Sequence, residues 1–298
     1  MKRRLTLGQT LRYGVEAAGF FLLMGIFRTL SLDAASNLGG WMGRRIFSRL
    51  PPDKIARANL KAAYPEKTAA ARDAIRIAMW DNLGRTVAEY PHLKQFSFNG
   101  ADPRLQIEHI GYLHAALARD KGLLFLSGHM GNWELLPITG QIWGLDGATV
   151  VRPPNNPYVA NWIARQRGLT GPKDQIGKHS GAKRIFVQLR SGKVIYMLAD
   201  QKNNEGIAVP FFGRDAMTTP VPAALALKLG ATILFAASHR RGRSARFDII
   251  VEPAIDFTPS GDEARDTRML TEMITARIEK MIRAEPSQWL WIHRRWPA

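Results

Sequence analysis

The amino-acid sequence predicts an α/β protein whose central sheet is mostly parallel and flanked by helices, with a hydrophobic helix at the N-terminus. Three observations support this fold class. Short apolar runs rich in β-branched and aromatic residues alternate with helix-like segments of about ten to fifteen residues, the pattern of a parallel sheet covered on both faces. A clean apolar stretch, Ala17–Phe27, follows a basic start. The 298 residues suffice for one large domain with a substantial core.

The N-terminal stretch has the composition of a membrane-attachment helix. As a helix, Ala17–Phe27 covers roughly 16 Å at about 1.5 Å per residue, which is short of a bilayer core. Extending it to Tyr13–Leu32 reaches spanning length but includes Glu16 and Arg28. A signal peptide also has a basic start and a short apolar region, but no convincing A-x-A site follows here. We therefore expect residues 1–35 to attach the protein to a membrane.

The next segment, SNLGGWMGRRIFSRLPPDKIARANLKAAYP, mixes apolar and basic side chains. This composition is typical of an amphipathic helix that lies in an anionic membrane interface. The alternative is an ordinary solvated helix face packed on the domain. Basic residues on both sides of the apolar stretch favour a cytoplasmic location for the body of the chain, which we expect to be one α/β domain over residues 36–298.

The body of the chain begins with a helix and continues as alternating strands and helices. The spacing of Ile75, Met79 and Val87 predicts a helix over residues 70–95, ended by Pro91. The strand-like runs cover residues 122–127, 148–153, 193–200, 232–238 and 246–252. Helix-like segments cover residues 132–143, 155–168, 180–191, 220–229 and 263–284. We find no internal repeat, low-complexity segment or domain linker.

Composition narrows the classes of partner. The chain has no cysteine, which excludes disulfides, thiolate metal sites and a cysteine nucleophile, and fits a reducing compartment. Its net charge of +17 indicates a polyanionic partner, either nucleic acid, an anionic membrane surface or a phosphorylated substrate. No RNA-recognition signature, zinc finger or basic leucine zipper is present, so we expect no nucleic-acid partner.

The segment SGHMGNWELL, residues 127–136, carries the first candidate site. It has neither the two histidines of a zinc protease nor the G-x-S-x-G of a serine hydrolase. His129 ends a predicted strand and Glu134 begins the next helix, with Gly128 and Gly131 permitting a tight turn between them. A carboxylate on one imidazole nitrogen leaves the other free to take a proton from a hydroxyl. The alternative is a structural histidine beside an acid at a helix start.

Arginine and asparagine side chains follow at the next strand and helix. Arg152 ends a strand, Asn155 and Asn156 come before the next helix, and Arg165 and Arg167 lie on that helix. Guanidinium groups at such positions suit bidentate binding of phosphate or carboxylate. We predict that this set binds substrate, although a solvated basic face has the same composition.

Asp200 ends the strand-like run KVIYMLAD. Its carboxylate can orient an arginine, bind a sugar hydroxyl or cap the loop that follows. No cluster of Asp, Glu and His has metal-ligand spacing, and neither a P-loop nor G-x-G-x-x-G occurs. We therefore expect no metal and no bound cofactor.

Taken together, these motifs resemble a known family. H-x4-[D/E] after a strand is the signature of glycerolipid and lysophospholipid acyltransferases. The HMGNWE form, followed in order by RPPNNP, R-x-R-G, ADQ, VPFFG and the terminal QWLWIHRRW, is similar to the late acyltransferases of bacterial lipid A biosynthesis. The resemblance extends from the N-terminal hydrophobic helix to the last tryptophan.

The resemblance implies an O-acyltransferase at the bacterial inner membrane, with its catalytic domain on the cytoplasmic side. It would move a fatty acyl chain from acyl carrier protein to a hydroxyl of a phosphorylated lipid A precursor of the Kdo-lipid IVA type, in lipopolysaccharide biosynthesis. By position His129 would be the general base and Glu134 its orienting partner. The family's arginine falls on Arg165 or Arg167, and its aspartate on Asp200. Attack of a hydroxyl on a thioester needs a base and an oxyanion stabiliser, which agrees with the residues.

The sequence is also compatible with three other functions. One is a sister activity, acylation of another glycolipid such as a phosphatidylinositol mannoside by the same residues. A second is a non-catalytic basic protein that docks on anionic membranes, which would gain nothing from the spacing of His129 and Glu134. A nucleic-acid binder is the third.

Overall fold

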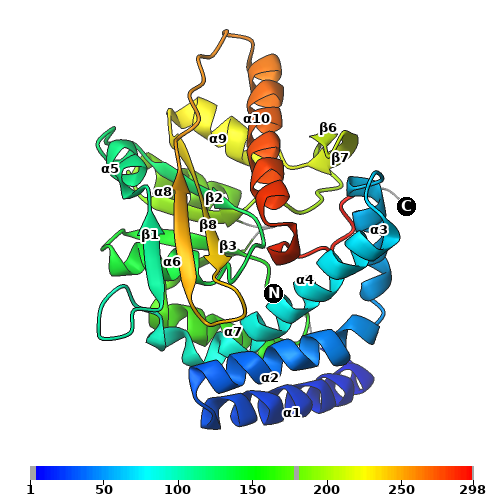
Figure 1. Ribbon diagram of the computed structural model, residues 1–298. Coiled ribbons are helices and arrows are strands. Elements are labelled where there is room, and N and C mark those ends of the chain that lie inside the picture. Colours follow the sequence, from blue (N-terminus) through cyan, green and yellow to red (C-terminus); the bar gives the residue numbers. More distant parts are fainter. Residues whose placement is uncertain (1–4, 178–180, 297–298) are drawn as a thin grey trace.

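A seven-stranded sheet forms the centre of the computed structural model, which describes residues 5–177 and 181–296 (Figure 1). The strand order is β1-β9-β8-β2-β5-β3-β4, and every neighbouring pair is parallel except β8 and β9. The strands are β1 (Leu105–Glu108), β2 (Leu123–Ser127), β3 (Gly147–Val151), β4 (Asp174–Gly177), β5 (Val194–Leu198), β8 (Thr232–Arg240) and β9 (Phe247–Glu252). The predicted α/β class with a mostly parallel sheet is therefore confirmed.

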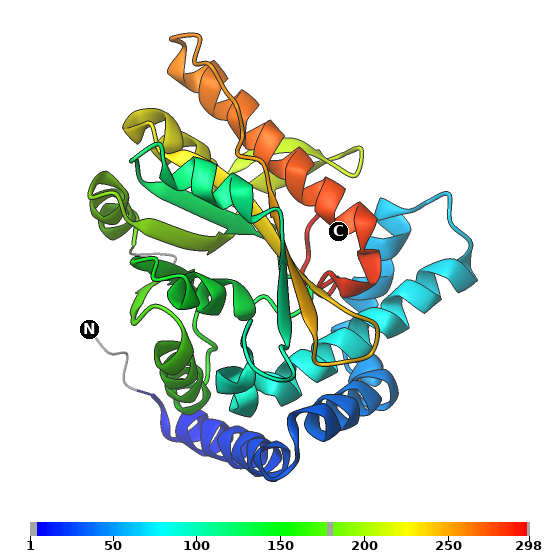
Figure 2. The ribbon, with the colours of Figure 1, turned by 60° about the vertical axis from the view of Figure 1, so that its left-hand side comes forward.

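Helices cover both faces of the sheet, because alternate side chains of its central strands point into two separate cores. Leu124 and Leu126 of β2 belong to one core, and Leu123 and Phe125 belong to the other. The first core is closed by α8 (Ala182–Arg190), α9 (Val221–Leu229) and α10 (Glu263–Ala284), and the second by α5 (Ile110–Leu117), α6 (Leu135–Ile142) and α7 (Pro157–Thr170) (Figure 2). All five residues of β2 are buried, which explains its uninterrupted apolar run.

The predicted helices and strands are present with ends shifted by a few residues, and residue 180 of one predicted helix lies outside the described residues. Besides short 3-10 turns, one helix and four strands were not predicted, the helix being α5 with eight residues. Strands β1 and β4 have only four residues each, too few for a periodic signal. A hairpin of β6 (Ile207–Phe211) and β7 (Arg214–Thr218) occupies the expected loop after Asp200. Its turn uses Phe212 and Gly213, both with positive φ.

The N-terminal third is helical. It contains α1 (Leu7–Thr29), α2 (Leu32–Arg45), α3 (Asp53–Ala63), α4 (Ala69–Glu89) and the 3-10 segment η2 (Tyr90–Gln95), and α1 packs against α7 and η2. Helix α1 begins at a capping box in which Thr6 and Gln9 each satisfy the other's backbone N–H. The predicted boundary between residues 35 and 36 falls inside α2. The predicted helix over 70–95 ends as α-helix at Glu89 and continues as η2.

Helix α1 has one face on the protein and one face exposed. Tyr13, Ala17, Met24 and Phe27 are buried, whereas the outer face presents exposed apolar side chains, among them Leu7, Leu11, Val15, Leu22 and Ile26. Within the described ranges, α1 is the one helix long and apolar enough to cross a membrane, and 22% of its apolar window is buried. The helix is consistent with membrane association.

Glycines allow α2 and α4 to pack with their backbones in close contact. A Cβ at Gly84 would lie 2.1 Å from the carbonyl oxygen of Gly39, and one at Gly43 would lie 1.9 Å from that of Trp80. Because both obstacles are backbone atoms of packed helices, neither can move without separating the helices.

We expect Gly84→Ala to lower the free energy of unfolding by about 1–3 kcal/mol, the usual cost of overpacking. Chemical denaturation in detergent measures the change. Gly25→Ala in α1 is the matched control, because its Cβ would meet nothing within 4 Å, and it should leave stability unchanged or raise it slightly. Equal stability of the two variants would contradict this account of helix packing.

Candidate functional site

His129 and Asp200 meet at the carboxyl edge of the sheet. Strands β2 and β5 are parallel neighbours in register, with Ser127 opposite Leu198, so the residues that follow each strand emerge side by side. The Nδ1 of His129 lies 2.8 Å from Oδ1 of Asp200, and the backbone N–H of His129 donates to Oδ2 at 2.8 Å. Since the carboxylate can only accept, Nδ1 carries the proton and Nε2 keeps its lone pair. These two contacts hold the imidazole in one tautomer and one orientation.

The carboxylate of Asp200 is buried, with 2% of the residue exposed, and the indole N–H of Trp289 donates to it at 2.7 Å. Burial alone would raise the pKa of Asp200. Attraction to the imidazolium form of His129 and the hydrogen bonds from His129 and Trp289 outweigh it and hold that pKa well below its ordinary value. Asp200 is therefore ionised across the physiological range.

Glycine is required at position 131, and a side chain at position 128 would crowd Asp200. Gly131 has φ +55°, and a Cβ there would lie 1.7 Å from the carbonyl oxygen of Ser238. A Cβ at Gly128 would come within 3.3 Å of the Asp200 carboxylate. The predicted tight turn is therefore present, and it brings His129 to Asp200.

Glu134 has a different set of partners, and the prediction that it orients His129 is wrong for this structure. Its buried carboxylate accepts from Nε and Nη2 of Arg167 at 2.7 and 2.6 Å and from the hydroxyl of Tyr90 at 2.6 Å. The side chain leaves the start of α6 toward α7 and η2. Asp200, far away in sequence but adjacent across the sheet, takes the place beside His129.

Glu134 and Arg167 form a buried ion pair. Burial alone would raise the pKa of Glu134, but the charge and hydrogen bonds of Arg167 lower it, while Glu134 in turn raises the pKa of Arg167. Desolvation raises the pKa of Tyr90 well above its ordinary value, so its hydroxyl stays a donor. Arg165 is exposed, so Arg167 is the arginine that lies next to the H-x4-E segment.

Trp133 links this ion pair to the His129 site. Its indole N–H donates to Glu134 at 3.0 Å, and its ring packs against the edge of the His129 imidazole at a centroid distance of 5.1 Å. A shift of the Glu134–Arg167 pair would thus reach His129 through a packed ring.

Three further residues that the sequence predicted to bind substrate, Arg152, Asn155 and Asn156, make no contact with His129. Arg152 and Asn155 are exposed and make no hydrogen bond or ion pair with any described residue. Asn156 is buried. It caps α7, and its amide donates to the backbone carbonyl of Tyr13 and to Glu16, so its contacts are structural and fasten α1 to the domain.

A C-terminal segment, which contains the motif QWLWIHRRW, packs against His129 and Asp200. The backbone N–H of Leu290 donates to the carbonyl of His129, and the indole of Trp289 reaches Asp200. His293 follows, with its ring 5.4 Å from that of His129. Gln201 lies between the two histidines, its amide nitrogen 3.3 Å from Nε2 of His129 and 3.0 Å from Nε2 of His293. The motif QWLWIHRRW was the only signal for this segment.

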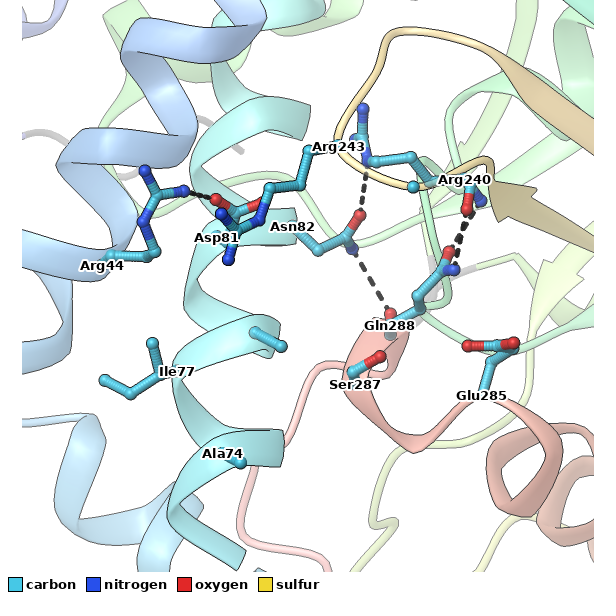
Figure 3. A pocket seen from close by; sticks show the side chains of 12 residues that line it. Arg44, Ala74, Ile77, Asp81, Asn82, Arg240, Arg243, Glu285, Ser287 and Gln288 are labelled. Atoms are coloured by element: carbon cyan, nitrogen blue, oxygen red, sulfur yellow. Dashed lines mark hydrogen bonds and ion pairs between the residues drawn. The ribbon is translucent and has the colours of Figure 1, made fainter. Parts of the chain in front are cut away.

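A groove lies beside α4, and one of its lining residues, Asn82, contacts the loop that carries His129 (Figure 3). It encloses about 360 Å³, and its lining includes Asn82, Arg240 and Gln288. Asn82 donates to the carbonyl of Gly131 at 2.9 Å and accepts from Arg240 at 2.8 Å, while Gln288 accepts from the backbone of Arg240 at 2.7 Å. A second cavity of about 460 Å³ shares Arg44 with the first and is lined by further arginines. We call the two together the arginine groove.

Among the residues that the structure describes, no group of three or more His, Asp or Glu side chains has the arrangement of a metal site.

A histidine hydrogen-bonded to a buried carboxylate at the strand ends of an α/β sheet has the geometry that acid–base chemistry requires. Comparison with known proteins identifies the class of protein. Residues 1–298 match the model of the bacterial lipid A biosynthesis acyltransferases, and the chain belongs to that family. It is an acyltransferase.

Curated relatives are similar over most of their length. A lipid A biosynthesis palmitoleoyltransferase of Escherichia coli is 24% identical over 265 residues, 86% of this chain and 83% of the relative. A phosphatidylinositol mannoside acyltransferase of Mycobacterium tuberculosis is 27% identical over 265 residues, 86% and 81% of the two chains. A lipid A biosynthesis lauroyltransferase of E. coli is 25% identical over 251 residues, 81% and 78% of the two chains.

Proposed function

We propose that the protein transfers a fatty acyl chain from acyl carrier protein to a hydroxyl of a phosphorylated lipid A precursor of the Kdo-lipid IVA type. His129 is the general base, and Asp200 rather than Glu134 orients it. The observation that carries the proposal is the 2.8 Å contact between Nδ1 of His129 and the buried carboxylate of Asp200, which leaves Nε2 as a proton acceptor.

The transfer follows from this arrangement. The acceptor hydroxyl gives its proton to Nε2 of His129 as its oxygen attacks the thioester carbonyl carbon. Asp200 stabilises the imidazolium that forms, as a buried carboxylate does in related dyads. The tetrahedral intermediate then collapses, the carbon–sulfur bond breaks, and the imidazolium returns the proton to the departing thiolate. An ester and a free thiol result.

Exposed arginines are the candidates for binding the acceptor phosphates. Arg152 and Arg165 have no carboxylate partner among the described residues, so their guanidinium groups are free to form bidentate contacts with phosphate. Arg167 is engaged by Glu134 through Nε and Nη2. In the proposal, this pair holds α7 in place beside the site, and Asn155 lies at the start of the same helix.

We place the protein at the bacterial inner membrane with its catalytic domain on the cytoplasmic side. The exposed apolar face of α1 supports attachment, and its opposite face packs on the domain from Tyr13 to Phe27. Such a helix can lie in the interface while the domain stays outside the bilayer. Residues 1–4, which supply the basic start, lie outside the described residues.

The arginine groove supports the assignment of an acidic carrier protein as donor. In this groove, the half-buried Arg44 pairs with Asp81, and the buried Arg240 pairs with Glu89. At its rim, Arg45, Arg49 and Arg243 are exposed and have no carboxylate partner within the described ranges. Free cations around a concave surface suit a convex acidic helix better than a flat bilayer.

We expect the triple variant Arg45→Glu, Arg49→Glu, Arg243→Glu to raise KM for the carrier-borne donor about tenfold, with little change in kcat, because rim charges act mainly on association. Steady-state transfer from acyl carrier protein measures it, with an acyl-pantetheine thioester as the donor that lacks the protein. A control triple at Arg119, Lys183 and Arg190, all exposed and none of them lining the arginine groove, makes the same change in charge. An equal effect on both donors would contradict carrier docking.

Acylation of a phosphatidylinositol mannoside is the second candidate, favoured by the 27% identity to the mycobacterial relative. Purified protein, a panel of acyl carrier protein thioesters and each acceptor in turn separate the two activities. Mass spectrometry should find one more acyl chain on Kdo-lipid IVA. Product on the mannoside alone would move the assignment to the second candidate.

A further inference from the structure

Gln201 lies against the proton-accepting atom of the base. It directly follows Asp200 at the end of β5, so the same strand end that fixes one nitrogen of His129 also delivers a side chain to the other. Its amide nitrogen is 3.3 Å from Nε2 of His129 and 3.0 Å from Nε2 of His293. The carboxamide therefore bridges two imidazole rings.

The hydrogen-bond donors and acceptors around Gln201 determine whether its NH2 group or its oxygen faces His129. Because Asp200 accepts the proton on Nδ1, Nε2 of His129 has a lone pair and needs a donor. The carboxamide oxygen of Gln201 in that position would meet the lone pair of an acceptor, whereas the NH2 group offers one hydrogen to each ring. The NH2 group of Gln201 thus faces the atom that takes the proton in the reaction.

The backbone of the glycine-rich turn does not offer a free donor for the oxyanion over residues 129–132. The N–H of His129 is bound by Asp200, and that of Met130 by the carbonyl of Gly128. The N–H of Gly131 donates to the carbonyl of Gln288, and that of Asn132 to the hydroxyl of Ser238. All four N–H groups therefore donate to acceptors within the protein, and none of the four is free to bind an oxyanion.

We propose that Gln201, positioned by His293, is the side-chain donor that stabilises the oxyanion of the tetrahedral intermediate. The inference rests on the proposed acyl transfer. A reacting hydroxyl must lie about 3 Å from Nε2 of His129, in the place where the amide now donates. When the hydroxyl occupies it, the freed N–H of Gln201 is next to the carbonyl under attack and donates to its oxygen as negative charge develops.

In this reaction Gln201 donates a hydrogen bond but does not transfer a proton. The acceptor oxygen forms a bond to the carbonyl carbon, and its proton goes to Nε2 of His129. The carbonyl oxygen gains the charge and accepts the hydrogen bond from Gln201. When the carbon–sulfur bond breaks, the electron pair leaves on sulfur, the proton follows from the imidazolium, and Gln201 can return to Nε2.

The test compares Gln201→Ala and Gln201→Glu with wild type in steady-state transfer to whichever acceptor the wild type uses. We expect kcat to fall about 100-fold to 1,000-fold in Gln201→Ala, the usual effect of losing one oxyanion donor, with KM changed less than about threefold. Gln201→Glu keeps the shape but removes the N–H, so it should lose at least as much. Thermal melts of the purified variants establish that they are folded.

His293 is a positioning residue in this scheme, and a double mutant separates that role from simple packing. We expect His293→Ala to lower kcat about tenfold in the wild-type background and to have no further effect on kcat in Gln201→Ala. Gln95→Ala is the matched control, since Gln95 donates to the ring of His92 at 3.0 Å in another glutamine–histidine pair, and its kcat should equal that of wild type.

The outcomes are distinct. An unchanged or increased kcat in Gln201→Ala would overturn the inference, the increase meaning that the amide only blocks the base. Additive losses in the His293→Ala, Gln201→Ala double mutant would remove His293 from the scheme. A wild-type enzyme that acylates no acceptor would refute the proposed function instead, before any variant is compared.

Discussion

Asp200→Asn should lower kcat by about 100-fold to 10,000-fold while leaving the fold intact. Asparagine has the shape of aspartate, and its oxygen can still accept from the backbone of His129 and the indole of Trp289. Its NH2 group, however, would donate to Nδ1 and move the imidazole proton to Nε2, where it prevents base catalysis. The equivalent change in a Ser-His-Asp triad has an effect of this order. Steady-state kinetics of acyl transfer measures the change, and we expect KM to stay close to that of wild type.

The same variant gives a pH test with a defined sign. The pKa of Asp200 is lower in the folded protein than its ordinary value of about 3.9, so its ionised form stabilises the fold above that pH. This contribution is lost as pH falls toward the folded-state pKa. The stability difference between wild type and Asp200→Asn should therefore be largest near neutrality and narrow below about pH 4. A difference that widened on acidification would contradict the assignment.

The second large effect concerns the buried pair of Glu89 and Arg240. Both residues are almost fully buried, with 0% and 5% of their surface exposed, and they lie between α4 and β8. Glu89 also accepts from Ser36 of α2 at 2.8 Å and from Asn132 of the His129 loop at 2.9 Å. The carboxylate of Glu89, on α4, therefore contacts α2 and the His129 loop, and it contacts the sheet through Arg240.

We expect Arg240→Met to lower the free energy of unfolding by about 3–5 kcal/mol, because it leaves the carboxylate of Glu89 buried without the cation that pairs with it. Chemical denaturation is the measurement. The double variant Glu89→Gln, Arg240→Met removes both charges and should recover a substantial part of the loss. A double variant less stable than the sum of the two single changes would show that the isolated charge is not the cause.

The positions of the site residues could be predicted from the sequence, but the contacts between them could not. His129 and Asp200 were both placed at strand ends, because short apolar runs bounded by polar residues mark such ends reliably. Their contact depends on β2 and β5 being neighbours, although β3 and β4 come between them in the chain. No local pattern reports that pairing, so Glu134, the nearest carboxylate after His129, was assigned instead.

The C-terminal segment shows the same limit. Trp289 and Trp291 of this segment are buried. The hydrogen bond from Trp289 to Asp200, and the position of His293 beside Gln201, depend on a chain return across the whole domain. Hydrophobic periodicity predicts which face of an element is buried, but not which distant side chain it will meet.

The measurement that tests the central claim most directly is transfer of a radiolabelled acyl chain from acyl carrier protein to Kdo-lipid IVA by wild type and by His129→Ala. We predict a labelled product with one more acyl chain for wild type and none above background for the variant, since no other described side chain shares the contact between Nδ1 and Asp200. Equal product from a folded His129→Ala variant would contradict the account, because another group would then take the proton from the hydroxyl.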